Sequence, residues 1–548
     1  MPYQCSPRRI QLLLLVLAAA AIVSILMVLF LFNYPSFARQ RVIDEMVFKN
    51  GTMEFERFQT TAELKNLRLA FYLFNITNVD DVVNNSSRIR LQEIGPYVYH
   101  EFKHKEIISD NQSDSLITFK LRKRYTFLPH QSVGDPRKDV IYWPNIPIVV
   151  LQTLLDDLPI GERFFALPLI NQVIKSKSEP AFISDNVENF LFNGSRRTFF
   201  EDLQKLDVLK IFKPWPLKDN KFAILYDKND TWTPGKDYLY SVSPGFGDNQ
   251  TYRDLNQYVL INGSATLPYW DTQPPMCNQL QGTDGQFFSP FLDDAQDLEV
   301  FAIDMCRKLS FKYRLSSTIN GVKVYKYTLD PRNLQSGQNN PENQCYCIRK
   351  SDNQCNLDGL VDLSSCIAPN IVGSGSHFLF GSPELLNRVD GLRAPNLTLD
   401  EPHIYVEPNT GLTIQVKTPI QLNIRLQSGG LKLFNFLKNE KPLILPLLTV
   451  AESAEMSDDQ AALLRNKLLL LDSWLISTVL GGTIIFVISI IVVGVVLCLR
   501  HRNSKIGETD PLLSRASSTT RVDNVSGASN RSRTLPATSN NSQNYMSV

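Results

Sequence analysis

Two long apolar segments near the ends of the chain constrain its fold more than any other feature. Residues 10–32 and residues 474–499 contain no charged side chain. At about 1.5 Å of rise per residue, the first segment forms a helix of roughly 35 Å, enough to cross a bilayer core of about 30 Å. The sequence between the two segments must then fold outside the bilayer.

Charges beside these segments predict their orientation. Arg8 and Arg9 precede the first segment, and Arg500, Arg502 and Lys505 follow the second. Positive flanks favour the cytosolic side. A cleaved signal peptide is the alternative for the first segment, but its apolar run exceeds the roughly 7–15 residues of a signal core, so we expect an uncleaved anchor. The expected organisation is a cytosolic N-terminus (1–9), a transmembrane helix (10–32), a lumenal or extracellular ectodomain (33–473), a second transmembrane helix (474–499) and a cytosolic tail (500–548).

Asn-x-Ser/Thr sequons support a secretory-pathway location for the ectodomain. Ten occur there, more than chance would give in such a chain, which is typical of a glycoprotein surface. The candidate glycosylation sites are Asn50, Asn75, Asn84, Asn85, Asn111, Asn193, Asn229, Asn249, Asn262 and Asn396.

Cysteine spacing fits disulfides better than metal. Cys345, Cys347, Cys355 and Cys366 follow C-x-C-x7-C-x10-C, whereas structural zinc sites usually contain C-x2–4-C pairs. With Cys277 and Cys306, the ectodomain contains six cysteines. In an oxidising compartment an even number predicts three disulfides, although six cysteines allow 15 pairings. Cys5 and Cys498 lie at cytosolic membrane boundaries and are either palmitoylation sites or inert thiols.

Hydrophobic periodicity predicts a mixed α+β ectodomain. Residues 116–127 and 413–426 alternate with period two and predict half-buried antiparallel strands; Pro419 indicates an edge or a bulge in the second. A helical cluster is expected over about 145–212. Its predicted helices are 147–158, 166–177, 185–192 (opened by a capping box of Asp185 and Glu188) and 198–212, and a further helix, about 458–471, leads into the second span.

The C-terminal tail is rich in Ser, Thr and Asn and is expected to be disordered. Within it, ETDPLLS (508–514) fits an acidic dileucine sorting signal, with Glu508 four residues before Leu512 and Leu513. Clathrin adaptors are the partners that read such signals; the alternative is a coincidental Leu-Leu pair.

Several motifs resemble the class B scavenger receptor family over about residues 8–500. They include KNGTMEFERF (49–58), RLQEIGPYVYHEF (90–102), CNQLQGTDGQFFSPF (277–291), FAIDMCR (301–307) and GLRAPNLTLDEPHIYVEPNTGLTIQVKTPIQLNI (391–424). The resemblance implies a large antiparallel β-barrel-like ectodomain, a helical bundle at its apex and an internal hydrophobic tunnel. Within the disulfide region 277–366 it also implies the pairing Cys277–Cys345, Cys306–Cys366 and Cys347–Cys355.

The resemblance further implies a function. A fatty acid translocase in the family receives anionic lipids and lipoproteins on a lysine-bearing helix, which corresponds to Lys175 and Lys177 here; a solvated lysine pair is the alternative. We therefore expect a receptor for lipids or lipoproteins (fatty acid, cholesterol or phospholipid) that passes lipid through the tunnel. It would lie in lysosomal and late endosomal membranes, or alternatively in the plasma membrane.

The second candidate function is a trafficking receptor for a lumenal hydrolase. The lysosomal branch of the family uses a bundle histidine as its pH sensor, but no histidine lies between residues 145 and 215 here, which argues against this function. An ectoenzyme is not supported, because the chain has no G-x-S-x-G, no H-E-x-x-H and no clustered metal ligands. We expect no catalytic residue, metal or cofactor. The net charge of +1 gives no indication of nucleic-acid binding.

Overall fold

The computed structural model describes residues 7–60, 67–111, 115–205, 219–229, 238–247, 250–270, 275–294, 296–347, 356–438 and 440–507. The chain divides into two compact units. One contains residues 1–31 and 477–548, and the other, which we call the ectodomain, contains residues 32–476.

A large antiparallel sheet forms the ectodomain, as predicted. Its hydrogen-bonded order in the described residues is β10-β11-β12-β15-β16-β17-β1-β2-β3-β8-β9, with β14 also pairing β16, and β13 pairing β14. The strands are β1 (Arg68–Ile76), β2 (Leu91–Asn111), β3 (Leu116–Phe127), β8 (Tyr240–Val242), β9 (Tyr258–Ile261), β10 (Leu298–Ala302), β11 (Arg307–Ile319), β12 (Val322–Leu329), β13 (Leu360–Asp362), β14 (Ile371–Gly375), β15 (His403–Val406), β16 (Thr413–Leu426) and β17 (Leu443–Glu455).

A short segment, Gly282 and Thr283, joins the two ends of this sheet. The Tyr258 amide at the β9 end donates to the Gly282 carbonyl. On the β10 side, the Thr283 amide donates to the carbonyl of Glu299, and the Phe301 amide donates to the carbonyl of Thr283. These three bonds nearly close the sheet into a barrel, so its inner face forms an interior that can be filled by side chains or by a ligand.

The two strands predicted from alternation are both present, as β3 and β16. Pro419 does not lie on an edge strand, because β16 is central and Pro419 pairs with Ala451 of β17. On the other side of β16, the pairing with β15 ends at Lys417 and the pairing with β14 begins at Ile420. Pro419 therefore lies beside a gap between neighbouring strands, which explains how the sheet accommodates a residue without an amide proton.

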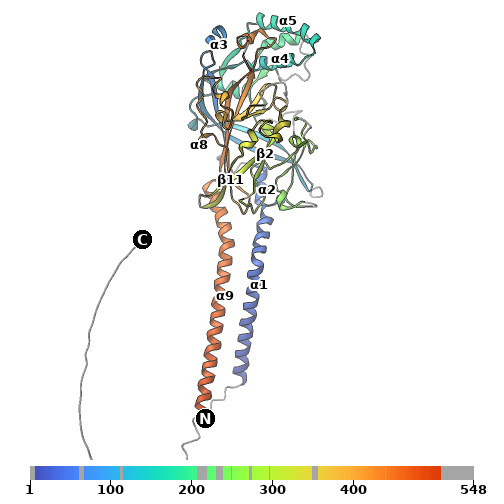
Figure 1. Cartoon of the computed structure of the whole chain (residues 1–548). Helices are drawn as coiled ribbons and strands as arrows, with labels where there is room; N and C mark the ends of the chain where they lie inside the picture. The colour runs from blue at the N-terminus through green and yellow to red at the C-terminus, as the bar shows by residue number, and fades with distance from the viewer. Residues whose placement is uncertain are drawn as a thin grey trace, which may run out of the picture. The chain divides into compact units, whose positions relative to one another are not determined.

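Helices gather at one end of the ectodomain (Figure 1), where α3, α4 and α5 lie, whereas α2 lies at the other end. Almost every residue of α4 is buried, which is typical of the central helix of a cluster. The short ectodomain helices are α2 (Met53–Gln59), α3 (Val79–Asn85), α4 (Ile146–Asp156), α5 (Ile160–Ser176), α6 (Thr198–Lys205), α7 (Pro383–Leu386), α8 (Leu397–Asp400), the π-helix η2 (Asn189–Asn193) and the 3-10 helices η1 (Pro129–Gln131), η4 (Tyr252–Asp254), η5 (Pro275–Asn278), η6 (Ile303–Met305), η7 (Pro331–Leu334), η8 (Pro341–Tyr346), η10 (Ser376–Phe378) and η11 (Lys432–Leu437).

The predicted helices 147–158 and 166–177 correspond to α4 and α5, and 198–212 is helical to Lys205 in α6, with the rest outside the described residues; 185–192 differs, since β5 ends at Asn186 and a π-helix covers Asn189–Asn193. Helix α5 begins at Ile160, six residues before the predicted start, and contains Pro168 within it. The predicted capping box is wrong, because Asp185 belongs to β5 (Phe182–Asn186), which pairs with β4 (Val140–Pro144). The Asn189 amide instead donates to the side chain of Asn186. Asp185, which the local pattern assigned to a helix cap, is therefore part of a strand pair. One further two-stranded pair is present, β6 (Ser195–Arg196) with β7 (Lys221–Phe222).

Two long helices contain the apolar segments. Helix α1 (Pro7–Met46) and helix α9 (Asp458–Gly507) both extend well beyond the predicted spans, and the predicted helix 458–471 is the first part of α9. Their stretches suited to crossing a membrane are Ala18–Met46 and Ile476–Val496. In the smaller unit, Met27 of α1 lies against Gly482 of α9 with no room for a Cβ atom. A glycine allows such close helix packing in a bilayer.

Candidate functional site

The barrel interior contains a cavity of about 270 Å³. Its wall is mainly apolar, with contributions from β3, β10, β11, β16 and β17 such as Phe119, Phe301, Phe311 and Ile414. Apolar walls with a few placed polar groups are typical of small-molecule sites, whose volumes are about 300–1,000 Å³. The cavity therefore has the mainly apolar character and approximate size of a small-molecule site.

Charged side chains interrupt this apolar wall. They come from β2, β3, β17, η6 and the segment that follows Thr283. We call them the ionic belt: Glu101, Lys103, Lys105, Lys123, Asp284, Asp304 and Glu452. All except Glu101 line the cavity directly.

Glu101 connects the two lysines at the centre of the belt. Its carboxylate is 1% exposed and lies 3.8 Å from the Lys103 ammonium and 3.7 Å from the Lys123 ammonium. Lys103 also donates to Glu452 at 2.5 Å, and Lys123 lies 3.5 Å from Asp304. The side chain of Asp304 lines the cavity and is 84% exposed.

Burial and charge shift the pKa values in this network in different directions. Burial raises the pKa of Glu101. Burial acts to lower the pKa of Lys103 and Lys123, but their carboxylate neighbours outweigh it and both pKa values are raised. Lys123 lowers the pKa of Asp304. The lysines of the centre are therefore firmly cationic, while Glu101 is the carboxyl group that most readily takes a proton.

Lys105 forms the other part of the belt. Its ammonium donates to Asp284 at 2.5 Å and lies 3.7 Å from the ring centre of Phe58, a cation–π distance. Asp284 also accepts from the Asn256 side chain and from the Gln286 amide. Burial lowers the pKa of Lys105, since the Asp284 charge offsets only part of the loss of hydration.

The sequence contained a signal for this belt that our prediction did not use. Lys123 occupies an inward position of β3 among Phe119, Leu121 and Tyr125, while the outward positions carry the other cations. In β2, Glu101, Lys103 and Lys105 likewise fall on one face. A charged residue at the apolar phase of an alternating strand indicates a functional interior.

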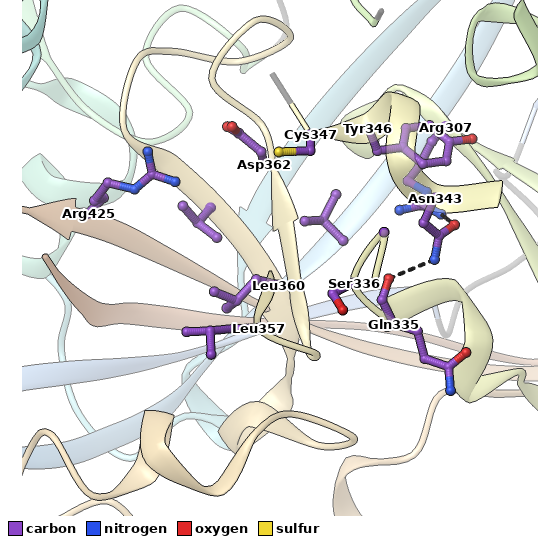
Figure 2. Close-up of a pocket in the computed structure, with 13 residues that line it drawn as sticks. Arg307, Gln335, Ser336, Asn343, Tyr346, Cys347, Leu357, Leu360, Asp362 and Arg425 are labelled. Carbon is purple, nitrogen blue, oxygen red and sulfur yellow. Dashed lines mark hydrogen bonds between the residues drawn. The ribbon is translucent and has the colours of Figure 1, made fainter. Parts of the chain in front are cut away.

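A second, much smaller cavity lies beside the cysteine-rich region. Figure 2 shows it between Arg307 and Tyr346 on one side and Leu357, Leu360 and Arg425 on the other. Its volume of about 40 Å³ suits water and is too small for a lipid chain. In the part of the chain that the structure describes, no group of three or more His, Cys, Asp or Glu side chains could hold a metal ion.

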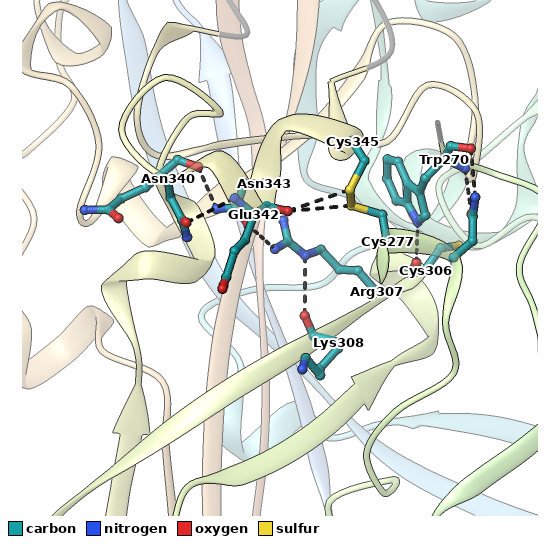
Figure 3. The surroundings of a disulfide bond; sticks show 11 residues. Trp270, Cys277, Cys306, Arg307, Lys308, Asn340, Glu342, Asn343 and Cys345 are labelled. Atoms are coloured by element: carbon teal, nitrogen blue, oxygen red, sulfur yellow. Dashed lines mark hydrogen bonds between the residues drawn. A yellow bond between two sulfur atoms is a disulfide. The ribbon is translucent and has the colours of Figure 1, made fainter. Parts of the chain in front are cut away.

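The disulfides agree with the pairing that the resemblance implied, as far as the described residues reach. Cys277 is bonded to Cys345 and Cys306 to Cys366, with Cα–Cα distances of 6.0 and 6.3 Å. Figure 3 shows the Trp270 indole donating to the Cys306 carbonyl beside these bridges. Cys347 is also disulfide-bonded. Its expected partner, Cys355, lies outside the described residues, as do Cys5, Glu508, Leu512 and Leu513; Cys498 is a free, exposed thiol.

The two predicted ligand lysines lie at the C-terminal end of α5 and differ in environment. Lys177 donates to Asp202 of α6 at 2.7 Å, which raises its pKa. Lys175 is exposed, and no ion pair of its ammonium is present among the described residues. Ile170, Val173 and Ile174 of the same helix are buried in the core. Lys175 is thus the freer of the two lysines to meet an anion.

An exposed apolar surface lies at the other end of α5. Phe164 and Phe165 are each 73% exposed, and Ile160 and Leu169 are also exposed. We call these four residues the α5 apolar face. Lys175 follows Phe164 by eleven residues, which is about three helical turns, so on a regular helix the two lie on the same side roughly 16 Å apart. Our sequence reasoning missed this face because it began the helix at residue 166.

Most sequons lie where a glycan can be attached. Asn50, Asn84, Asn85, Asn193, Asn229, Asn262 and Asn396 are exposed, Asn75 is partly buried, the side chain of Asn111 is not described, and Asn249 lies outside the described residues. None of the sequons falls within α5. Glycans attached at these positions would therefore not originate on the α5 apolar face.

A buried polar cluster surrounds His377 in η10. The imidazole is 1% exposed and lies 3.3 Å from Glu93 of β2 and 3.5 Å from Asp400 of α8. Asp400 accepts two hydrogen bonds from Arg393, at 2.6 and 2.7 Å, and one from the Ser376 hydroxyl. The cluster joins β2, η10 and α8 and lies outside the cavity wall.

A barrel-like domain with an internal cavity, preceded and followed in the chain by apolar helices long enough to cross a membrane, defines the class: a membrane protein with one large barrel-like domain. A model of the CD36 family matches residues 16–499, most of the sequence. The chain belongs to the CD36 family, the class B scavenger receptors, as the motifs indicated.

Individual relatives are similar to the chain at modest identity. Lysosome membrane protein 2 of Rattus norvegicus is 26% identical over 431 residues, covering 78% of this chain and 82% of the relative. Sensory neuron membrane protein 1 of Bombyx mori is 28% identical over 446 residues, with 79% and 81% covered. The human lysosome membrane protein 2 is 25% identical over 431 residues, with 78% and 82% covered.

Proposed function

We propose that the protein captures lipids or lipid particles on the α5 apolar face and passes lipid through the ectodomain cavity. The observation that carries this proposal is the pairing of an exposed apolar face with an internal, mainly apolar cavity of about 270 Å³ in one domain. Exposed aromatic side chains enter a lipid surface readily, because each buried Phe contributes about 1.5–3 kcal/mol. A continuous tunnel from face to membrane is part of this proposal.

Replacing Phe164 and Phe165 with Ser tests the capture step. We expect the double variant to lose at least about tenfold in affinity for lipoprotein particles, because two large apolar contacts disappear while folding is unaffected at side chains this exposed. Capture is measured with purified full-length protein and labelled particles. The matched control replaces Leu397 and Leu399, which are 58% and 53% exposed on α8, with Ser. An equal loss in both double variants would contradict the assignment.

Lys175 should contribute charge rather than contact area. Replacing Lys175 and Lys177 with Ala is expected to slow the capture of anionic particles at low salt, and most of the effect should follow Lys175, since Lys177 is paired with Asp202. Association rates at low and high salt measure it. Unchanged rates at low salt would remove the lysines from the capture site.

The relatives support an endosomal and lysosomal location, and the tail supplies a mechanism. We propose that Glu508, Leu512 and Leu513 recruit clathrin adaptors. Replacing both leucines with Ala should move the protein to the plasma membrane, because the apolar anchor of the signal is lost. Surface biotinylation measures the shift, with Val522→Ala plus Val525→Ala in the same tail as control. Equal surface fractions would instead favour a cell-surface receptor.

A protein ligand is the second candidate. The α5 apolar face has the exposed aromatic chemistry of a protein-binding hot spot, and similarity to lysosome membrane protein 2 of two mammals makes a lumenal hydrolase the partner to consider. Mass spectrometry of the purified glycoprotein separates the two functions: co-purified lipid supports the first, and a stoichiometric lumenal protein supports the second.

A further inference from the structure

The charges that line the cavity are unequal in number. Three lysines, Lys103, Lys105 and Lys123, line it among the described residues, against four carboxylates: Asp284, Asp304, Glu452 and Glu455. Glu101 lies directly behind the central lysines and adds a fifth carboxyl group. The belt therefore contains no excess of positive charge with which to hold an anion.

The belt also leaves polar capacity facing the cavity. Among the described residues, Asp304 forms one ion pair, with Lys123 at 3.5 Å, and its cavity-lining side chain is 84% exposed. Each lysine ammonium carries three protons, and the hydrogen bond of Lys105 to Asp284 uses one of them. The cavity thus offers both acceptors and donors to a ligand, close to an apolar wall.

We propose that the ionic belt is a head-group site for amphiphiles whose polar head is neutral overall and both donates and accepts hydrogen bonds. This inference rests on the proposed function, since it names the lipid class that the cavity accepts. A hydroxylated or zwitterionic head can accept hydrogen bonds from the lysines and also interact favourably with the carboxylates. A free carboxylate adds a negative charge to a site in which carboxylates already outnumber lysines. A fully apolar ester leaves the buried charges without compensation.

Three lipids with the same oleoyl chain test the proposal: monooleoyl glycerol, oleate and methyl oleate. Binding to the full-length protein in detergent is measured by competition with a fluorescent lipid at about pH 8, where oleate is ionised. We expect monooleoyl glycerol to bind at least about tenfold more tightly than either of the others. Equal or tighter binding of oleate overturns the head-group site while leaving lipid binding intact. No binding of any of the three overturns the proposed function as well.

Charge-removing variants show whether the belt is responsible. Asp304→Asn removes an exposed carboxylate whose ion pair among the described residues is the one with Lys123 at 3.5 Å, so folding should persist. It should raise the affinity for oleate several-fold, up to about tenfold, with little effect on methyl oleate. Glu455→Gln, also exposed in the cavity wall, gives a second variant of the same kind.

Asp390→Asn is the control, because Asp390 lies outside the cavity in an exposed pair with Arg88. A preference between oleate and monooleoyl glycerol that is the same in wild type, Asp304→Asn and Glu455→Gln would overturn the proposal, whichever lipid binds more tightly.

Discussion

Replacing Asp400 with Ala is expected to lower the free energy of unfolding of the ectodomain by about 3–5 kcal/mol. Its carboxylate is 3% exposed and accepts hydrogen bonds from Arg393, from the Ser376 hydroxyl and from the Asn396 amide. The variant leaves these donors and His377 without their acceptor inside the protein. Buried donors that lose a charged acceptor keep their desolvation cost and lose the compensating bond.

Thermal unfolding of the full-length protein in detergent measures this effect. Asp390→Ala is the matched control, because Asp390 forms an ion pair with Arg88 at 3.3 Å in which both side chains are about half exposed. Such surface pairs contribute about 0–1 kcal/mol, so the control should melt close to the wild type. Similar melting temperatures for the two variants would mean that the cluster around Asp400 does not stabilise the fold.

Acidification from about pH 8 to about pH 5 is expected to stabilise the ectodomain through His377. Burial acts to lower the pKa of His377, but hydrogen bonds with Asp400 and Glu93 outweigh burial and the net pKa is raised. A raised folded-state pKa means that the folded protein binds the proton more tightly than the unfolded chain. The stabilisation is therefore complete below the unfolded value of about 6.5 and is lost as pH rises through the folded value.

Asp400 does not oppose this gain in stability between about pH 8 and pH 5. Hydrogen bonds from Arg393 and its other donors outweigh burial and hold its pKa far below the usual value, so its stabilisation is present above about pH 4 and disappears only in stronger acid. Burial raises the pKa of Glu101, which adds to stabilisation by acid.

The measurement is the melting temperature of the full-length protein between about pH 5 and pH 8. His377→Gln should reduce the gain on acidification, and Glu101→Gln should reduce it further, because each removes one proton site. A His377→Gln protein whose melting temperature depends on pH as strongly as the wild type would show that another group is responsible.

Local patterns predicted the elements of this fold better than its site. Period-two alternation located β3 and β16, and long charge-free runs located both apolar helices, because these signals depend on which faces are buried along a single segment. The closure of the barrel through Gly282 and Thr283 depends on bonds between strands far apart in the sequence, and no local pattern contains it. The capping box at Asp185 failed for the same reason, since pairing with Ile141 decided its conformation.

The candidate site was predicted from resemblance only in part. Lys175 and Lys177 were named from the resemblance, yet Lys177 is engaged by Asp202, and the exposed aromatic pair Phe164 and Phe165 was not recognised. The ionic belt is an assembly of charges from β2, β3, β17 and η6. Strand alternation places Lys123, Lys103 and Lys105 on inward faces, but only the barrel brings these charges next to Asp304 and Glu452.

The closing segment of the barrel has a consequence for how the wall can open. Gly282 and Thr283 hold the two ends of the sheet together, and the next residue, Asp284, accepts a hydrogen bond from Lys105 in the cavity wall. The long pairing of β16 with β17 makes the opposite wall far stronger than this seam, which depends on three backbone bonds. A ligand that draws Lys105 away from Asp284 therefore acts directly beside this short seam. Ligand binding in the cavity and opening of the barrel wall are thus linked through the adjacent residues Thr283 and Asp284.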